Sequence, residues 1–281
     1  LFTIISKMSY AINCSSWNRH GRNFSNCTGD ACVAYVYDGW LNRMSCATNT
    51  MFSNISGCYG KPGEGVVCSC QTEMCNTLDT MNELTIILRP EIACFPTTHS
   101  QCDAPLSCVA SRIDGEDQND CAYIGSALDF HELHANLMLE QTSKYVLDDE
   151  RNLVPKLATD FYANCVDDAC IGKAQILRKN GFNSTKRQVV CHTYRKGEER
   201  KPKLSCVGDF CYYENASGAV TRGCYTVQDS IAARKLTVGF YQYFEFVAYL
   251  CDQDYCNDDM ISAKMNISPA EERETTPFPM E

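Results

Sequence analysis

Cysteine is the residue that most limits what this chain can fold into. The sequence holds 20 cysteines in 281 residues, a density typical of small scaffolds that depend on disulfides rather than on a large apolar core. Disulfides persist in oxidising compartments, so the composition predicts an extracellular protein, either secreted or the ectodomain of a cell-surface protein. In a cytosolic chain the same cysteines would have to hold metals or remain free thiols.

Acceptor motifs for N-linked glycans support an extracellular location. The motif Asn-X-Ser/Thr is modified in the secretory pathway, and it predicts glycosylation at seven positions: Asn13, Asn23, Asn26, Asn54, Asn183, Asn215 and Asn266. Asn13 and Asn26 have cysteine as the middle residue, and we rank them below the other five. No apolar run approaches the roughly 20 residues that a membrane-spanning helix needs. We expect any membrane attachment to come from an anchor outside this chain.

Two short phrases recur along the sequence. The first, Cys27-Thr-Gly-Asp-Ala-Cys32, returns as Cys206-Val-Gly-Asp-Phe-Cys211. The second, Cys70-Gln-Thr-Glu-Met-Cys75-Asn76, returns as Cys251-Asp-Gln-Asp-Tyr-Cys256-Asn257. Recurrence of both phrases in the same order predicts two copies of one structural unit.

A more divergent copy lies between these two. It opens with Cys94, Cys102, Cys108 and Cys121 and closes at Cys165-Val-Asp-Asp-Ala-Cys170, where Ile171 replaces the final Asn. The three copies hold eight, six and six cysteines, so each cysteine has a possible partner within its own copy. We predict three tandem domains over residues 1–80, 81–172 and 173–259. Residues 260–281 are charged and proline-rich and hold no cysteine, which predicts a flexible stalk.

The cysteine order and the closing Cys-X4-Cys-Asn resemble the three-finger superfamily, which includes snake neurotoxins, urokinase-receptor domains and activin-receptor ectodomains. The shared positions are also similar to the nematode cysteine-rich repeat called the ET module. The resemblance covers about 14–76, 94–171 and 191–257. It implies a mainly β, disulfide-rich fold in which each copy is a small antiparallel sheet that projects three hairpin loops.

The resemblance also implies a disulfide pairing, which spacing alone leaves open. The implied pairs in the first copy are Cys14–Cys32, Cys27–Cys46, Cys58–Cys68 and Cys70–Cys75. In the second copy they are Cys94–Cys108, Cys102–Cys121 and Cys165–Cys170. In the third copy they are Cys191–Cys211, Cys206–Cys224 and Cys251–Cys256.

Local patterns add secondary structure to this outline. Residues 189–194 read as the first strand of the third copy, and the aromatic segment 236–250 reads as its last hairpin. Those rings either pack against the sheet or form an exposed interface. In the middle copy, Ser126-Ala-Leu-Asp129 resembles a capping box, and Leu128, Leu133, Leu137 and Met138 have partly helical spacing. We therefore predict a helix over 127–145, within a helical insertion at about 125–160.

No motif indicates an enzyme, and we predict no catalytic residues, no cofactor and no metal. The histidines of His131-Glu-Leu-His134 are three residues apart, whereas the zinc-protease motif needs them four apart. The acidic segment 114–120 lacks the order of ligands and glycine found in EF-hands. We expect a solvated acidic loop at the tip of the middle copy's central finger, and a calcium site is the alternative.

Charge is divided between the second and third copies. Residues 81–171 are acidic overall and residues 172–257 are basic, with Lys201 in the basic cluster of the third copy's first finger. Such asymmetry either steers a charged partner or lets the two copies dock against each other. The whole chain has a net charge of −10, which argues against nucleic acid as a partner.

Three-finger domains are mostly binding modules, so the resemblance implies protein recognition. We expect a receptor or adhesion ectodomain that binds an extracellular protein ligand or receptor. The alternatives are a secreted, toxin-like antagonist of a receptor and a structural matrix protein. Tyr, Trp and Arg are enriched in binding hot spots, so the candidate residues are Tyr35, Tyr37, Trp40 and Arg43, together with Lys201. Asp38-Gly39 predicts a tight turn that puts Trp40 near a fingertip, either exposed or folded back.

Overall fold

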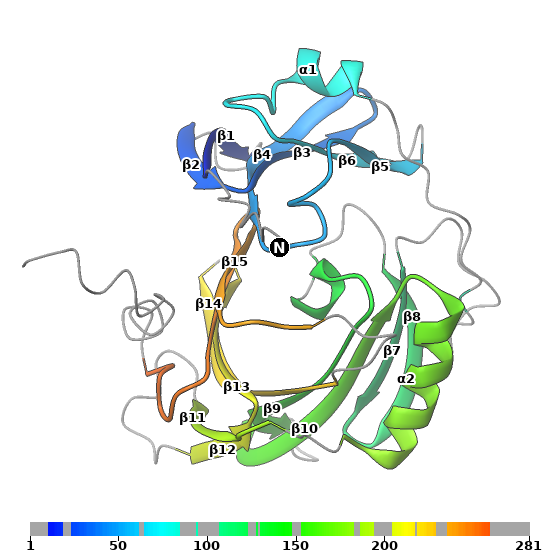
Figure 1. Cartoon of the computed structure of the whole chain (residues 1–281), viewed down its shortest axis with the longest axis vertical. Helices are drawn as coiled ribbons and strands as arrows, with labels where there is room; N and C mark the ends of the chain where they lie inside the picture. Colours follow the sequence, from blue (N-terminus) through cyan, green and yellow to red (C-terminus); the bar gives the residue numbers. More distant parts are fainter. Residues whose placement is uncertain are drawn as a thin grey trace, which may run out of the picture. The chain divides into compact units, whose positions relative to one another are not determined.

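The computed structural model divides into two compact units (Figure 1). The structure describes residues 11–18, 24–61, 65–84, 94, 107–122, 128, 130–147, 153–182, 186–193, 204–216, 218–228 and 235–258. The first unit comprises Leu1–Pro90, Ile124–Ser126 and Gln242–Phe244, and the second comprises Glu91–Tyr123, Ala127–Tyr241 and Glu245–Glu281. The first cysteine group therefore forms one unit, and the second and third groups share the other.

The first unit is an antiparallel β-structure. Its strands are β1 (Ile12–Asn18), β2 (Ser25–Gly29), β3 (Ala31–Tyr37), β4 (Trp40–Thr48), β5 (Gly57–Lys61) and β6 (Gly65–Cys70). The main sheet has the order β5-β6-β3-β4, and β1 pairs with both β4 and β2. A short helix, α1 (Leu78–Glu83), follows the last cysteine and is capped by the Thr77 side chain.

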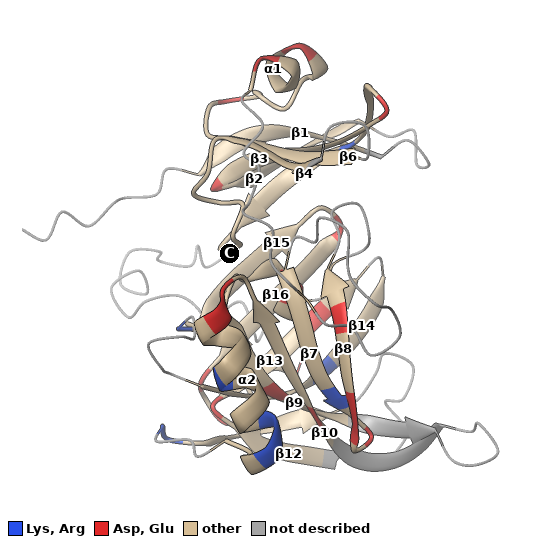
Figure 2. Ribbon diagram, turned by 90° about the vertical axis from the view of Figure 1, so that its right-hand side faces the viewer, with Lys and Arg blue, Asp and Glu red and all other residues tan. Residues whose placement is uncertain are grey.

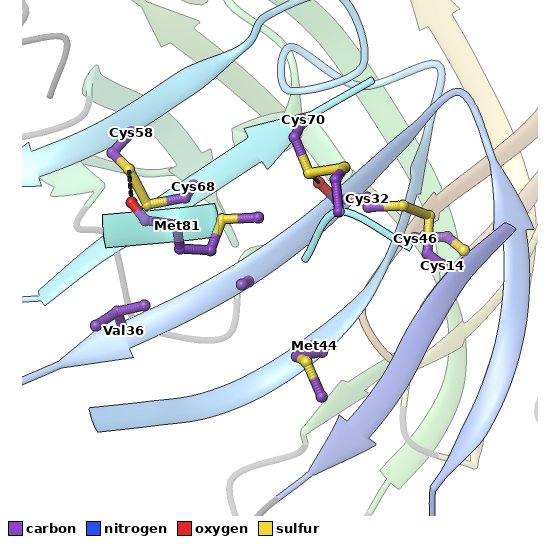
Figure 3. Packing of buried hydrophobic residues seen from close by; sticks show 11 residues of the cluster. Cys14, Cys32, Val36, Met44, Cys46, Cys58, Cys68, Cys70 and Met81 are labelled. Atoms are coloured by element: carbon purple, nitrogen blue, oxygen red, sulfur yellow. Dashed lines mark hydrogen bonds between the residues drawn. A yellow bond between two sulfur atoms is a disulfide. The ribbon is translucent and has the colours of Figure 1, made fainter. Parts of the chain in front are cut away.

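Disulfides form the centre of the first unit (Figure 3). Four bonds join Cys14–Cys32, Cys27–Cys46, Cys58–Cys68 and Cys70–Cys75, which are the pairs expected for this copy. Val36, Met44 and Met81 pack among the sulfur atoms as buried apolar side chains. A unit of this size buries little apolar surface, so crosslinks worth roughly 2–4 kcal/mol each account for much of its stability.

The second unit is built on one long antiparallel sheet. Its strand order is β15-β16-β13-β14-β9-β10-β7-β8. The strands are β7 (Ser107–Ile113), β8 (Glu116–Ala122), β9 (Leu137–Leu147), β10 (Leu153–Cys165), β13 (Phe210–Ala216), β14 (Ala219–Val227), β15 (Gly239–Tyr243) and β16 (Phe246–Cys251). The last two residues of β15, Gln242 and Tyr243, are counted with the first unit. A separate ribbon pairs β11 (Val189–Thr193) with β12 (Leu204–Gly208). The predicted first strand and last hairpin of the third copy are confirmed as β11 and β15–β16.

Five of the six disulfides expected in the second unit lie within its described residues. Five bonds join Cys94–Cys108, Cys165–Cys170, Cys191–Cys211, Cys206–Cys224 and Cys251–Cys256. The expected Cys102–Cys121 pair involves Cys102, which lies outside the described residues.

The second and third copies join through strand pairing and aromatic packing. β14 of the third copy pairs with β9 of the second, from Cys224 opposite Thr142 to Val227 opposite Leu139. Phe130 stacks on Tyr225 with ring centroids 5.2 Å apart and meets the edge of Tyr241. The two copies therefore join through a strand ladder and aromatic rings. Docking through their opposite charges stays a prediction.

A buried asparagine ties the strands of the first copy together. The Nδ2 group of Asn76 donates to the carbonyls of Ser15, Val33 and Ser45 at 2.7, 3.2 and 3.2 Å. Its Oδ1 accepts from the Ser15 amide at 3.1 Å. One side chain thus satisfies backbone groups of β1, β3 and β4, where an unpaired group would be costly.

The asparagine that closes the third copy makes the same set of bonds. Asn257 Nδ2 donates to the carbonyls of His192, Tyr212 and Gly223, and Asn257 Oδ1 accepts from the His192 amide. Asn257 therefore joins β11, β13 and β14 as Asn76 joins β1, β3 and β4. The repeated Cys-X4-Cys-Asn phrase corresponds to a repeated structural role.

The Gly-Asp pair of the first recurring motif, Gly29-Asp30 and Gly208-Asp209, has the same structural role in both copies. A Cβ on Gly29 or on Gly208 would lie 2.9 Å from a cysteine Cβ and a backbone oxygen, so both positions require the absence of a side chain. Asp30 accepts a hydrogen bond from the Asn49 amide, and Asp209 accepts one from the Val227 amide, both at 2.9 Å. The two carboxylates fix the chain where the strands β4 and β14 end.

The predicted helix over 127–145 is wrong for most of its length. Phe130–Leu133 forms one turn of 3-10 helix, and Leu137 then begins the long strand β9. β9 is paired on both sides, with β10 and with β14, and it buries Leu137, Met138 and Leu139 completely or nearly so. A strand covered on both faces reads as a continuous apolar run, which local spacing cannot distinguish from a buried helix. Within the predicted insertion, residues 153–160 are part of β10, and residues 148–152 lie outside the described residues.

The main helix of the second unit lies after the closing cysteines instead. α2 (Asp168–Asn180) starts at Asp167, whose side chain accepts from the Cys170 amide, and is followed by Gly181 at φ 71°. Figure 2 shows acidic residues at its start and basic residues at its end, the arrangement that the helix dipole favours. Arg178 and Lys179 are the basic residues of its last turn. No helix in the described part of the chain is long and apolar enough to cross a membrane.

Candidate protein-binding surface

The hairpin β3–β4 carries the predicted binding residues of the first unit. Its turn places Asp38 at φ 52° and Gly39 at φ 72°, the left-handed conformations that a two-residue hairpin turn requires. Tyr37 and Trp40 face each other across this turn as the last cross-strand pair. The Asp-Gly signal thus locates the tip correctly.

A β-bulge places the four predicted side chains on one face. Tyr37 pairs with Trp40 and Tyr35 pairs with Arg43, with a register shift between Tyr35 and Val36. Without this shift, strand alternation would put Arg43 on the face opposite to Trp40. The extra residue, Asn42, donates its Nδ2 to the Trp40 carbonyl at 3.0 Å. The structure therefore gathers Tyr35, Tyr37, Trp40 and Arg43 into one surface, which we call the hairpin face.

The opposite face of the same hairpin is fixed by the core. Val36 and Met44 are buried among the disulfides (Figure 3). Ala34 belongs to the same buried cluster, and Leu41 packs against it. β3 is also paired on its far side with β6, where Tyr35 lies opposite Val67. The backbone under the hairpin face is therefore supported by the core packing on its opposite face and by the pairing of β3 with β6 along one edge.

The outer half of the hairpin face is open to solvent. Trp40 is 69% exposed and Tyr37 is 52% exposed, so Trp40 does not fold back onto the protein. Tyr35 and Arg43 are partly buried nearer the base. The Tyr35 ring lies against Gly65, where a Cβ would come within 2.8 Å of the phenol oxygen. Burial raises the pKa of the Tyr35 phenol, Tyr37 raises it further and Arg43 opposes the rise, so Tyr35 is a neutral hydrogen-bonding group at neutral pH.

Phe24 and Tyr255 are exposed aromatic residues that the sequence analysis did not select. Phe24 is 75% exposed and stacks on Trp17 with ring centroids 5.7 Å apart. It precedes β2 in a segment without turn or repeat signals, so nothing in the local sequence singled it out.

The remaining predicted site residues are dispersed. Asn13, Asn26 and Asn54 are exposed, and Asn215 is partly buried with its Oδ1 accepting from the Gly218 amide at 2.8 Å. Asn23, Asn183, Asn266 and Lys201 lie outside the described residues.

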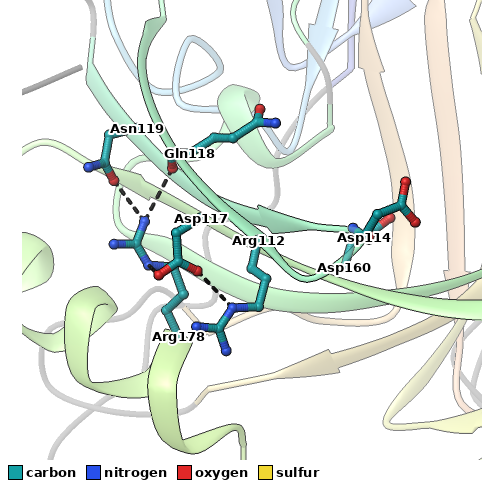
Figure 4. A network of polar contacts seen from close by, with 7 residues as sticks. All are labelled: Arg112, Asp114, Asp117, Gln118, Asn119, Asp160 and Arg178. Carbon is teal, nitrogen blue, oxygen red and sulfur yellow. Dashed lines mark hydrogen bonds and ion pairs between the residues drawn. The ribbon is translucent and has the colours of Figure 1, made fainter. Parts of the chain in front are cut away.

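The acidic segment of the second copy forms the β7–β8 hairpin, as expected for its central finger. Asp117 pairs with Arg112 at 2.7 Å and with Arg178 of α2 at 3.5 Å (Figure 4). Arg178 also donates to Gln118 O and Asn119 Oδ1 at 3.2 and 2.8 Å. The hydrogen bond from Arg112 is the main cause of the lowered pKa of Asp117. Among the described residues, no group of three or more His, Cys, Asp or Glu side chains could hold a metal ion.

The two histidines of the short His-Glu-Leu-His motif serve packing. His131 stacks on Tyr162 with ring centroids 4.4 Å apart. His134 is fully buried, with its ring against the edges of Phe130 and Tyr241. Both belong to the aromatic junction between the second and third copies.

Comparison with known proteins gives one family match. A family model described as "Domain of unknown function (DUF7622)" matches residues 184–261, the region of the third copy. No curated protein and no solved structure matches the chain. The disulfide-rich antiparallel fold is compatible with a three-finger-like architecture.

Proposed function

We propose that this chain is an extracellular protein-binding ectodomain of the receptor or adhesion type, and that the hairpin face is its binding surface. The observation that carries the proposal is the exposure of Trp40 and Tyr37 at the tip of a hairpin. Exposed aromatic side chains at one spot mark interaction sites more often than isolated ones do, and tryptophan and tyrosine dominate binding hot spots.

Rigidity of the scaffold supports the same proposal. Binding costs free energy when loops and side chains must become ordered. The hairpin face lies on two strands whose opposite side packs on disulfides. The backbone is therefore already ordered before a partner binds, and binding costs little conformational entropy. Tryptophan and tyrosine also have few rotatable bonds for the surface that they bury.

We propose further that the chain is built from three-finger-like copies. Equivalent roles of Asn76 and Asn257, of Gly29 and Gly208, and of Asp30 and Asp209 support a common unit for the first and third copies. Proteins of the three-finger superfamily mostly bind other proteins through their fingers and sheet faces. For this chain the same role is inferred by analogy of fold, and the analogy does not identify a binding site.

The partner that this surface fits is a protein with an apolar patch, which Trp40 and Tyr37 would contact. Disulfides and glycan acceptor motifs support an encounter outside the cell.

A binding screen tests the proposal. The chain is displayed as a multimer, so that weak contacts add up, against a library of extracellular proteins from the same organism. We expect at least one saturable partner that fails to bind the Trp40→Ala variant. Self-association without any other partner would favour a structural matrix protein. A partner that is itself a signalling receptor, and that the soluble chain blocks, would favour the secreted antagonist.

A further inference from the structure

The ribbon β1–β2 brings two glycan acceptor motifs together. In its register Asn13 faces Thr28 and Ser15 faces Asn26, with Cys14 opposite Cys27 between the two pairs. Asn13 and Ser15 are the first and last residues of one motif, and Asn26 and Thr28 are those of the other. Each acceptor asparagine therefore lies across the ribbon from the hydroxyl residue of the other motif.

Both motifs point away from the core. Cys14 and Cys27 are bonded to Cys32 and Cys46. Because alternate residues of a strand face opposite sides, the residues on either side of these cysteines face outward. Asn13, Asn26 and Thr28 are exposed and Ser15 is partly so. The middle cysteines of the two motifs thus leave the acceptor groups on the free side of the ribbon.

The two acceptor carboxamides are not engaged by the fold. Asn13 contacts the rest of the unit through its backbone, with its amide bonded to Glu73 and its carbonyl to the Met74 amide. Within the described part of the chain, neither the Asn13 nor the Asn26 side chain makes a hydrogen bond. The Asn215 carboxamide, by contrast, is used in the turn at Gly218.

The equivalent ribbon of the third copy lacks this arrangement. In β11–β12, Val190 faces Val207 and His192 faces Ser205, so the matching outward positions hold no acceptor asparagine. The paired motifs are a property of the first copy and not a requirement of the fold.

We propose that Asn13 and Asn26 both carry N-linked glycans, which together cover the outer face of the β1–β2 ribbon. In each transfer the carboxamide Nδ2 loses a proton and bonds to the anomeric carbon of an oligosaccharide, and the lipid pyrophosphate of the donor leaves. The two sites are diagonal neighbours, about 7–8 Å apart between Cα atoms. Two glycans this close exclude a protein partner from the ribbon.

Site mapping tests the proposal. The full chain is secreted from mammalian cells behind a signal peptide and treated with a peptide N-glycosidase, which converts each glycosylated Asn to Asp. Mass spectrometry of the peptides is expected to show Asp at both positions. Thr28→Val should remove the glycan at Asn26 alone, and Ser15→Ala should remove that at Asn13 alone.

Conservative variants separate glycan loss from misfolding. Thr28→Ser and Ser15→Thr keep the motifs, so both glycans should remain. Unmodified Asn at either position of the wild-type chain would overturn the proposal, whether or not Asn54 is converted. Conversion at Asn54 without conversion at Asn13 and Asn26 would show that the chain met the transferase and that this ribbon was not its substrate.

Discussion

Two buried asparagines show what single residues contribute to this fold. Asn76 pairs with four backbone groups of the first unit. Asn76→Ala should therefore lower the free energy of unfolding on the order of 3 kcal/mol, because buried polar groups lose their partners. Denaturant unfolding followed by tryptophan fluorescence measures this change, since both tryptophans, Trp17 and Trp40, belong to the first unit.

The matched control for this variant is an asparagine of the same unit that is less buried. Asn42 makes a bond to the Trp40 carbonyl in an exposed setting, so Asn42→Ala should change stability by no more than about 0.5 kcal/mol. Equal effects of the two substitutions would mean that the amide of Asn76 is not the clamp that its geometry indicates.

At the residue scale, the residues that could be predicted from the sequence are those in the two recurring cysteine motifs. The two short cysteine motifs and the terminal Asn recur with fixed internal spacing, and their positions in the structure follow that recurrence. The cysteine pairing was implied by the family resemblance. The hairpin face was partly predictable, because Asp38-Gly39 marks the turn and Trp40 follows it. The shared face of Arg43 and Trp40 was not, because it depends on a bulge at Asn42 that single-residue preferences do not specify.

At the scale of single elements, the turn of the β3–β4 hairpin depends on the backbone conformation of Gly39. Gly39 has φ 72° and no atom within 4 Å of the position of an added Cβ, so a substitution there meets only backbone strain. Gly39→Ala should destabilise the first unit by about 1 kcal/mol, measured by tryptophan-detected unfolding.

A second glycine provides the opposite case. Gly172 also has open space around it but lies inside helix α2, where alanine is favoured by roughly 0.5–1 kcal/mol. Gly172→Ala should therefore stabilise the second unit, as read from thermal unfolding by circular dichroism. Effects of the same sign at both glycines would contradict the backbone assignment of one of them.

Strand β9 shows where element prediction fails. Leu137, Met138 and Leu139 are good helix formers, and the preceding residues resemble a helix start, yet they form the centre of a sheet. The deciding contacts come from β10 and from β14, the latter more than 70 residues away in sequence. Non-local pairing of this kind overrides local propensity. Helix α2, by contrast, has an N-cap aspartate and a following glycine, signals that were present in the sequence and were not used.

The carboxylate on β9 gives this strand a pH dependence. Burial raises the pKa of Glu140 above its ordinary value, and a hydrogen bond from the Phe182 amide opposes the rise. The folded state then binds more protons than the unfolded state between the two pKa values, so ionised Glu140 costs stability at neutral pH. Glu140→Gln should raise the unfolding midpoint at pH 7, and the gain should disappear as the pH falls below the ordinary value of 4.5. A gain that persisted at low pH would show that the carboxylate charge is not its cause.

At the scale of the whole molecule, the second and third copies form one body. Phe130 of the second copy packs on Tyr225 and Tyr241 of the third, and β9 continues the sheet of β14. Phe130→Ala should therefore destabilise the second unit by about 3–5 kcal/mol, with loss of the near-ultraviolet signal from both copies together. Loss of signal from one copy alone would show that the junction does not couple them.

The sequence predicts three copies of a motif, and the structure shows that two of them share a sheet. This grouping could not be anticipated from the cysteines, which bond within each copy. It depends on the aromatic rings of residues 236–250 and on Tyr225, whose packing against Phe130 becomes evident only in three dimensions.

The central claim is that the hairpin face binds a protein, and one comparison tests it most directly. A partner found with the wild-type chain is titrated against Trp40→Ala and against Phe24→Ala, which removes an aromatic ring of similar exposure elsewhere in the first unit. We predict that Trp40→Ala weakens binding by at least about 30-fold, or ~2 kcal/mol, and that Phe24→Ala leaves it within about threefold of wild type. Equal affinity of the wild-type chain and Trp40→Ala for every partner would contradict the claim.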